Sequence, residues 1–570
     1  MTATVDTPQR RVAPAVRRAR LDPARQFTLF VIAAMLVGLA LRVAAGLTDD
    51  APSTDETAYL RSGMSLVEGD GFARDGRPEL HFPPFVPFLL GLMSRVVDDP
   101  HTGTVVLTCL ASTALIVPLA LLGRRVAGTA GGVATAWIAA LAPGVSTTLV
   151  NRGAGSEAEY LLLLTTAVWL AVSAGDHRAR PRMVRVAASG LLVGLAYLTR
   201  PEGLFVAVPL GLVVLVLGSR TAGTPRRRVL ATGALTAAFV VPIVACVVPY
   251  AAFLHRHTGT WQLSAKTQDA SMEAWQAVAS ADREARDSVL WSLDDTGLAL
   301  ANTERTSLAQ LAHDDPSGYA DILGTNVVAL VGLVADPESG RVLSWLLLPL
   351  PVWALAVHGA WRHRRTRTML AVLAVGALPV ATALAFFVQP RYLMLTTALA
   401  TVPAGAGVAS LSGRSRQSAA ALTVALLLAS SVQSFRGPGG WWHPSDHTDQ
   451  RAVGEWIAAH TDPDDRVMSR SMIVEYYAER PTMAIPYASM DEIITYGRHY
   501  GARYLVVDWY TVRRLRPQLA PLREEDPDVP GLELVHAVTA EGRTTLVFAF
   551  DPAPPVPEEM GAPLSFVGDG

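Results

Sequence analysis

Long apolar segments separated by shorter polar loops run through the first three quarters of the chain. A helix needs about 20 apolar residues to cross roughly 30 Å of hydrocarbon. We predict eleven membrane-spanning segments, at residues 27–47, 105–122, 131–149, 159–175, 184–198, 203–219, 229–254, 341–359, 368–388, 393–411 and 418–434. The first could instead be a cleaved signal sequence, because a basic stretch precedes it and Ala44, Ala45 and Gly46 are small. Its apolar run is longer than a typical signal core, so we expect an anchor.

Composition supports a membrane protein. Half of the 570 residues are hydrophobic, 17% are charged, and the mean hydropathy is +0.29. Soluble domains carry about 25% charged residues, so an ordinary soluble enzyme is excluded. The net charge of −2 says little about partners. Cys109 and Cys246 lie in apolar segments, so no disulfide framework is expected.

The arginines alternate along the chain in a way that indicates sidedness. They gather in the N-terminal tail and then in every second loop, at residues 124–125, 178–185, 220–228, 362–367 and 414–416. Cytoplasmic loops collect Lys and Arg near the ends of membrane spans. We therefore expect a plasma-membrane protein with a cytoplasmic N-terminus. With an odd number of spans, the C-terminal region is extracytoplasmic.

This pattern divides the chain into three parts. Residues 1–26 form a basic cytoplasmic tail, and residues 27–434 form a transmembrane domain with external loops at 48–104 and 255–340. The second loop has helical patterning from 272 to 290 and a possible interfacial helix near 322–334. After a Gly- and Pro-rich stretch at 436–440, helical and short apolar runs alternate. Residues 435–570 are therefore expected to form an extracytoplasmic α/β domain.

Ionisable residues are almost absent from the middle of the predicted spans. Transporters and pumps usually carry such groups there, because a buried charge is costly unless it serves function. Here polar groups gather at the external ends of the spans, including Glu157 and Glu159 at the start of the fourth span. The pattern favours a site at the outer membrane face.

Two candidate motifs lie in the first external loop. Asp55 and Glu56 form an acidic pair that could supply a general base and a metal or substrate ligand. The pair could equally belong to a solvated loop with Asp or Thr as a helix N-cap. His81-Phe82-Pro83-Pro84 predicts a rigid, extended entry into an apolar stretch. By itself that motif indicates only an interfacial turn, with His81 as a candidate substrate contact.

Two further motifs place arginine at external boundaries. Arg200 lies in Thr199-Arg200-Pro201-Glu202, and Arg391 lies in Pro390-Arg391-Tyr392. Arginine can hold a phosphate through charge-assisted, bidentate contacts. Arg200 could also pair with Glu202 or a lipid headgroup. With the acidic pair and Glu157, the two arginines suggest a site for a phosphorylated sugar.

In this order, the four motifs resemble the GT-C superfamily of membrane glycosyltransferases. The resemblance covers residues 27–411 and is closest to the branch of protein O-mannosyltransferases and lipid A aminoarabinose transferases. Two departures stand out. The lysine that the aminoarabinose branch carries beside its proline pair is replaced by His81-Phe82, and Trp441-Trp442-His443 lacks the aspartate of the oligosaccharyltransferase motif.

The resemblance implies an inverting transfer of one sugar from a polyprenyl-phosphate donor to a glycan, lipid or protein acceptor, at the membrane and without nucleic acid. It implies Asp55 as base, with Glu56 as its catalytic neighbour. It implies Arg391, Arg200 and Glu157 as substrate contacts, with Glu159 as an alternative to Glu157. Tyr392, beside Arg391, and His81, which the proline pair would aim at the same cavity, are further candidate contacts. A divalent cation is an optional cofactor, with Glu56 and Glu157 as candidate ligands.

The sugar and the class of protein leave alternatives open. Lys266 is the only lysine, a skew that suggests a GC-rich genome and favours arabinofuranose or mannose in cell-wall biogenesis. A lipid-linked sugar flippase is the main competitor and would move the lipid without bond cleavage. A third hypothesis is a non-catalytic envelope protein that binds glycan.

Overall fold

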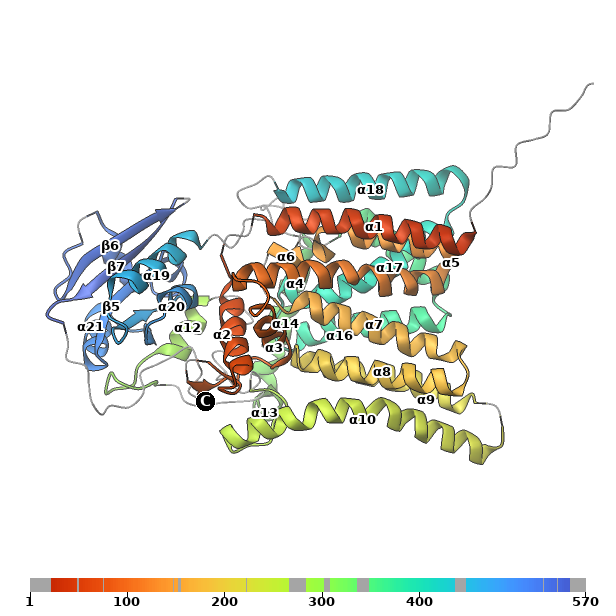
Figure 1. Ribbon diagram of the computed structural model, residues 1–570, viewed down its shortest axis with the longest axis horizontal. Helices are drawn as coiled ribbons and strands as arrows, with labels where there is room; N and C mark the ends of the chain where they lie inside the picture. The colour runs from red at the N-terminus through yellow and green to blue at the C-terminus, as the bar shows by residue number, and fades with distance from the viewer. Residues whose placement is uncertain are drawn as a thin grey trace, which may run out of the picture.

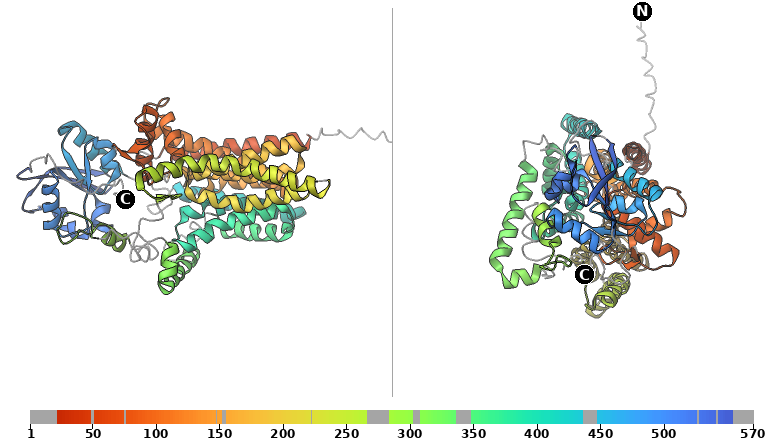
Figure 2. Two further views of the ribbon diagram at one scale, coloured as in Figure 1. Left: turned by 90° about the horizontal axis from the view of Figure 1, so that it is seen from below. Right: turned by 90° about the vertical axis from the view of Figure 1, so that its left-hand side faces the viewer.

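The structure is a computed structural model, viewed along three axes in Figures 1 and 2. It describes residues 22–48, 51–74, 76–146, 148–151, 155–221, 223–265, 283–301, 308–335, 348–435, 447–525, 527–540 and 542–553. Residues 1–21 of the predicted basic tail, the Gly- and Pro-rich stretch at 436–440 and the Trp441-Trp442-His443 motif lie outside the described residues.

Long helices form the membrane domain and run side by side (Figure 1). They are α1 (Pro23–Gly46), α4 (Pro100–Ala114), α5 (Ile116–Leu141), α7 (Glu157–Ser173), α8 (Ala179–Tyr197), α9 (Ala207–Ser219), α10 (Pro225–Thr258), α15 (Leu350–His363), α16 (Arg367–Ala385), α17 (Met394–Ser410) and α18 (Gly413–Phe435). A helix lies on the described part of every predicted span. Within the described residues, seven helical stretches are long and apolar enough to cross a membrane. The fold is therefore that of a multi-pass membrane protein, and the number of eleven spans stays a prediction.

One of the seven stretches, residues 100–141, reverses direction inside α5. The helix breaks at Ala127 and Gly128, and Gly128 has φ +69°, a left-handed conformation that glycine adopts without steric cost. The two arms then pack closely, since a Cβ on Gly132 would lie 2.8 Å from the carbonyl oxygen of Ala120. The two arms of this hairpin correspond to the two separate spans that the sequence predicted at 105–122 and 131–149.

The external segments lie at one end of the bundle, next to the C-terminal domain (Figures 1 and 2). The first contains α2 (Thr54–Glu68), the short hairpin β1 (Ala73–Arg74) and β2 (Arg77–Pro78), and α3 (Phe85–Met93). The second contains α12 (Arg283–Trp291), α13 (Leu308–Asp314) and α14 (Pro316–Ala335). The helix expected near 322–334 is therefore present as α14.

A five-stranded sheet with helices forms the C-terminal domain, as the sequence predicted. Its elements are α19 (Thr448–His460), β3 (Arg466–Ser469), α20 (Met472–Ala478), β4 (Thr482–Ala484), α21 (Met490–His499), β5 (Ala502–Val507), α22 (Trp509–Arg514), β6 (Leu532–Ala540) and β7 (Arg543–Phe550). The strand order is β4-β3-β5-β7-β6. β3 is parallel to β4 and β5, whereas β7 is antiparallel to β5 and β6.

The arginine-rich turns lie at the other end of the bundle. Figure 1 shows the start of α1 and the turn between α9 and α10 far from the C-terminal domain. The end of the bundle far from the C-terminal domain therefore carries the arginine-rich turns, as expected from the alternation of arginines along the chain. That the arginine-rich end faces the cytoplasm stays a prediction from the sequence.

Candidate active site

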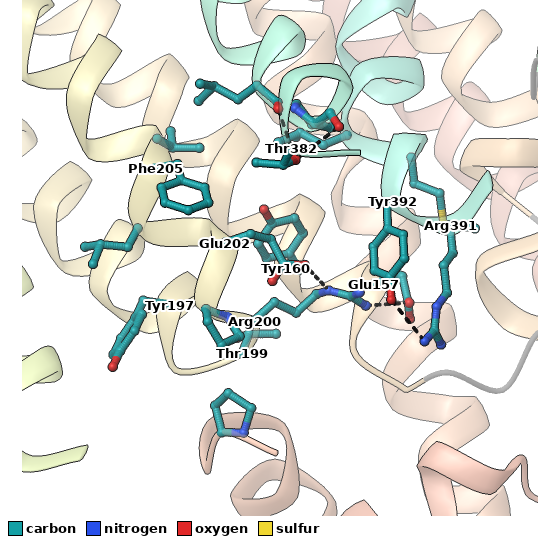
Figure 3. A pocket seen from close by; sticks show the side chains of 18 of the residues that line it. Glu157, Tyr160, Tyr197, Thr199, Arg200, Glu202, Phe205, Thr382, Arg391 and Tyr392 are labelled. Carbon is teal, nitrogen blue, oxygen red and sulfur yellow. Dashed lines mark hydrogen bonds and ion pairs between the residues drawn. The ribbon is translucent and has the colours of Figure 1, made fainter. Parts of the chain in front are cut away.

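A pocket of about 470 Å³ lies where the start of α2, the start of α7, the turn after α8 and the turn before α17 meet. Figure 3 shows side chains that line it. One part of its lining is polar and includes Asp55, Tyr59, Glu157, Tyr160, Arg200, Glu202, Arg391 and Tyr392. Another part is apolar and includes Leu204, Phe205, Val206, Leu378, Pro379, Ala383, Phe386, Phe387, Met394 and Leu395. A charged group and a hydrocarbon chain could therefore occupy the same pocket.

Asp55 and Arg391 meet at this pocket although they are 336 positions apart. Arg391 donates from Nη1 to Oδ2 of Asp55 at 2.8 Å, and the two side chains are 35% and 31% exposed. Asp55 lies in the first turn of α2, where a carboxylate is favoured by the helix dipole. Arg391 lies in the short helical turn η5 (Pro390–Leu393), which opens α17.

Arg200 forms the second cationic centre. It lies at the N-cap of η3 (Pro201–Val206), between α8 and α9. Its Nη1 donates to Oε1 of Glu157 at 2.5 Å, and its Nε donates to Oε1 of Glu202 at 2.8 Å. The Arg200 side chain is 14% exposed, so this arginine is more deeply placed than Arg391. The pairing of Arg200 with Glu202 that the sequence suggested is present, and Glu157 is a second partner that the sequence did not indicate.

Tyrosines surround the two guanidinium groups. The ring centre of Tyr392 lies 5.3 Å from Cζ of Arg391 and 5.6 Å from Cζ of Arg200, within the range of cation–π attraction. The Tyr59 hydroxyl donates to Oγ of Ser156 at 3.4 Å. Burial, with the nearby charge of Asp55, raises the pKa of Tyr59, so this phenol stays neutral. Neutral phenols can donate hydrogen bonds to a phosphate or a sugar.

Glu56 and His81 lie outside the lining of this pocket. Glu56 is fully buried, and its Oε1 lies 2.8 Å from Nδ1 of His101. Its other oxygen accepts from the backbone N–H of Ser53, whose side chain caps α2 in a capping box. His81 is exposed, while Pro83 of the same motif lines the pocket. The catalytic role of Glu56 and the substrate contact of His81 stay predictions. The positions of both residues outside the pocket lining argue against these roles.

The predicted metal ligands are not arranged as a metal site. Glu56 is bound to His101 and Ser53, and Glu157 is bound to Arg200. Within the described part of the chain, no group of three or more His, Cys, Asp or Glu side chains could hold a metal ion. These residues do not fit the implied cation.

Glu157 and Glu159 have different surroundings, although both lie in the first turn of α7. Glu157 lines the pocket. Glu159 is 4% exposed, and neither of its carboxylate oxygens has a hydrogen-bond partner among the residues that the structure describes. Glu157 is therefore the acidic residue of this pair that can reach a ligand.

The sequence analysis missed several residues that line the pocket. They are Tyr59, Tyr160, Phe386 and Phe387. Tyr59 could have been found, because a residue four positions after Asp55 shares its face of a helix. The two phenylalanines follow α16 and gave no signal beyond the apolar character of a span end.

The comparisons with known proteins agree with this architecture. Residues 81–247 match the family model described as dolichyl-phosphate-mannose-protein mannosyltransferase. No curated protein matches the chain. Among solved structures, ArnT from Cupriavidus metallidurans bound to undecaprenyl phosphate is similar, with a TM-score of 0.54 and 14% identity over 92% of this chain and 98% of that one.

Two other solved structures share the fold. The Archaeoglobus fulgidus oligosaccharyltransferase tethered to an acceptor peptide has a TM-score of 0.52 and 12% identity, over 85% of this chain and 69% of that one. The arabinofuranosyltransferase AftD from mycobacteria has a TM-score of 0.52 and 14% identity, over 91% of this chain and 41% of that one. The chain therefore has the fold of the GT-C membrane glycosyltransferases, as its four motifs predicted.

Proposed function

We propose that the protein is an inverting glycosyltransferase that moves one sugar from a polyprenyl-phosphate donor to an acceptor at the extracytoplasmic membrane face. The observation that carries the proposal is the Asp55–Arg391 contact of 2.8 Å at the pocket. A carboxylate can accept a proton and a guanidinium can bind a phosphate, and the proposed reaction needs both groups side by side. The family model at residues 81–247 supports the same class of donor.

The reaction follows from these two groups. The acceptor hydroxyl attacks the anomeric carbon from the face opposite the phosphate, and Asp55 takes the hydroxyl proton. The bond between the anomeric carbon and the phosphate oxygen breaks, and polyprenyl phosphate leaves with the electron pair. Arg391 and Arg200 stabilise the negative charge that develops on that phosphate. Such fixed cations are most effective in a partly dehydrated site.

The apolar part of the lining suits the isoprenoid chain. Phe205 is 45% exposed, and the neighbouring Val208 and Leu212 on α9 are 68% and 59% exposed, as expected for side chains that face lipid. A polyprenyl chain could therefore pass from the bilayer into the pocket without crossing water. ArnT, which has the same fold, was solved with undecaprenyl phosphate.

The sugar and the acceptor are narrower proposals. Arabinofuranose and mannose are the sugars that the composition favours, and an envelope glycan, a lipid or a protein is the acceptor. Glu157 and Glu202 are placed to accept hydrogen bonds from sugar hydroxyls once a phosphate draws Arg200 away from them.

Purified protein in lipid nanodiscs tests the proposal. It is incubated with polyprenyl-phosphate pentoses and hexoses and with candidate acceptors, and released polyprenyl phosphate is measured by mass spectrometry. We expect acceptor-dependent release from one donor. A flippase would instead move labelled donor across proteoliposomes without cleaving it, and a glycan-binding protein would do neither.

A further inference from the structure

The end of α16 is held by side chains from α14. Asn326 of α14 is fully buried, and its Nδ2 donates to the carbonyl oxygens of Leu384 at 2.9 Å and Phe386 at 3.1 Å. Tyr319 donates more weakly to the carbonyl of Ala385 at 3.5 Å. The last carbonyls of a helix have no partner within the helix. α14 therefore satisfies three consecutive carbonyls that α16 cannot satisfy itself.

The residues held in this way form one wall of the pocket. Phe386 and Phe387 line it, and the Phe387 ring packs edge-on against Tyr392, with ring centres 5.2 Å apart. Arg391 follows four residues after Phe387. The position of the α16 end thus determines where two aromatic rings and the phosphate-binding arginine lie.

The other end of the same external segment is fixed to the C-terminal domain. Asp287 of α12 is fully buried and accepts from Arg470 at 2.7 Å and from Arg516 at 3.0 Å. Beyond Asp287, Val289 and Leu290 pack in one apolar cluster with Phe386 and Phe387. The segment is therefore anchored on the C-terminal domain and ends against the pocket wall.

We propose that Asn326 is a positioning residue, which by capping the C-terminal end of α16 sets the place of Phe386, Phe387 and Arg391 for the donor. The inference rests on the proposed function for the identity of the donor. It assigns a role to the second external loop, whose sequence showed only weak patterning. Asn326 contacts backbone and lies outside the pocket lining, so it acts through the groups it holds.

Asn326→Leu tests the proposal, with Thr325→Val as the matched control, because Thr325 is the exposed neighbour on the same helix. We expect Asn326→Leu to speed hydrogen–deuterium exchange of the amides at 384–392. We also expect undecaprenyl phosphate to bind about tenfold more weakly, the effect of losing one or two buried hydrogen bonds. The control should change neither. Asn326→Gln, which keeps the carboxamide, should recover part of the affinity.

Other results would overturn the inference. One such result is unchanged hydrogen–deuterium exchange at 384–392 together with unchanged undecaprenyl phosphate binding in Asn326→Leu. Another is a lower melting temperature of Asn326→Leu without a loss of affinity for undecaprenyl phosphate. If Asn326→Leu does not fold, Asn326→Asp removes the N–H donors at nearly the same volume, and the same criteria apply. Exchange needs no turnover, so a failure to transfer any sugar would count against the proposed function and not against this role.

Discussion

Asp55 and Arg391 neutralise each other at the pocket, with 2.8 Å between Oδ2 and Nη1. A carboxylate paired with a guanidinium is a poorer base, and a guanidinium paired with a carboxylate is a poorer phosphate ligand. Both side chains are about one third exposed, and pairs of this kind contribute little to stability because water screens them. An incoming phosphate can therefore take Arg391, and Asp55 then becomes a better proton acceptor.

Asp55→Asn should lower transfer and raise phosphate affinity. Loss of a general base costs about 10²- to 10⁴-fold in rate. Undecaprenyl phosphate should bind several-fold more tightly, since Arg391 no longer has a competing carboxylate. Single-turnover transfer and equilibrium binding in nanodiscs measure the two effects. Glu68→Gln, at the exposed far end of α2, is the control. Weaker binding by Asp55→Asn would contradict the competition between Asp55 and phosphate.

Arg391→Ala and Arg200→Ala should have different effects on donor binding and on thermal stability. Arg391 is partly exposed and pairs with Asp55, so its removal should weaken donor binding by at least tenfold and leave the melting temperature close to that of the wild type. Arg200 pairs with Glu157, whose side chain is 6% exposed, so removal of Arg200 takes the counter-ion from a buried carboxylate, which is strongly destabilising. We expect Arg200→Ala to lose both binding and stability.

Donor titrations and thermal melts of the two variants separate these effects. Arg95→Ala, an exposed arginine of the first external segment, should match the wild type in both. If Arg391→Ala bound donor normally, Arg391 would not be the phosphate ligand.

Much of this architecture follows from sequence periodicity and charge. A helix lies on each predicted span, and the α/β domain lies where short apolar runs alternate with helical ones. The convergence of Asp55, Glu157, Arg200 and Arg391 followed from sidedness, because loops at one end of a bundle share one surface. Their contacts did not follow from it, since residues 336 positions apart meet only through tertiary packing.

Glu56 shows where the sequence analysis stopped short. Treated as part of a loop, Asp55 and Glu56 were expected to act together. On a helix, successive side chains point about 100° apart, so Asp55 faces the pocket while Glu56 turns toward His101. Ser53 followed three positions later by Glu56 is a capping-box sequence, so the signal was present. Asn326 gave no comparable signal, because its partners lie on another helix.

Glu56→Gln and Glu56→Ala test whether Glu56 is structural. Glutamine can replace glutamate in a capping box, so Glu56→Gln should keep near-normal transfer. Glu56→Ala loses the cap and the contact with His101, which should cost about 1–2 kcal/mol of stability. Thermal melts and transfer rates measure the two properties. A large loss of turnover in a folded, thermally stable Glu56→Gln protein would restore the catalytic role expected from the resemblance.

Asp287 makes the anchoring of the second external segment depend on pH in a defined direction. Burial alone would raise the pKa of Asp287, but the charges of Arg470 and Arg516 outweigh it, so the pKa lies below the ordinary value. A carboxyl group with a lowered pKa contributes stability that is complete above its unfolded pKa of about 3.9 and is lost as the pH falls through the folded value. The anchor should therefore remain intact at pH 5 and weaken only below about pH 4.

Limited proteolysis between pH 7 and pH 3, with an acid-tolerant protease, follows this transition at residues 283–301. Asp287→Asn should release the segment at neutral pH, because it removes the buried carboxylate with which Arg470 and Arg516 both pair. Glu284→Gln, on the same helix, removes only the charge from a contact with the Tyr487 hydroxyl and should keep the wild-type profile. Release of the segment in wild-type protein at pH 5 to 6 would show that Asp287 is not the anchor.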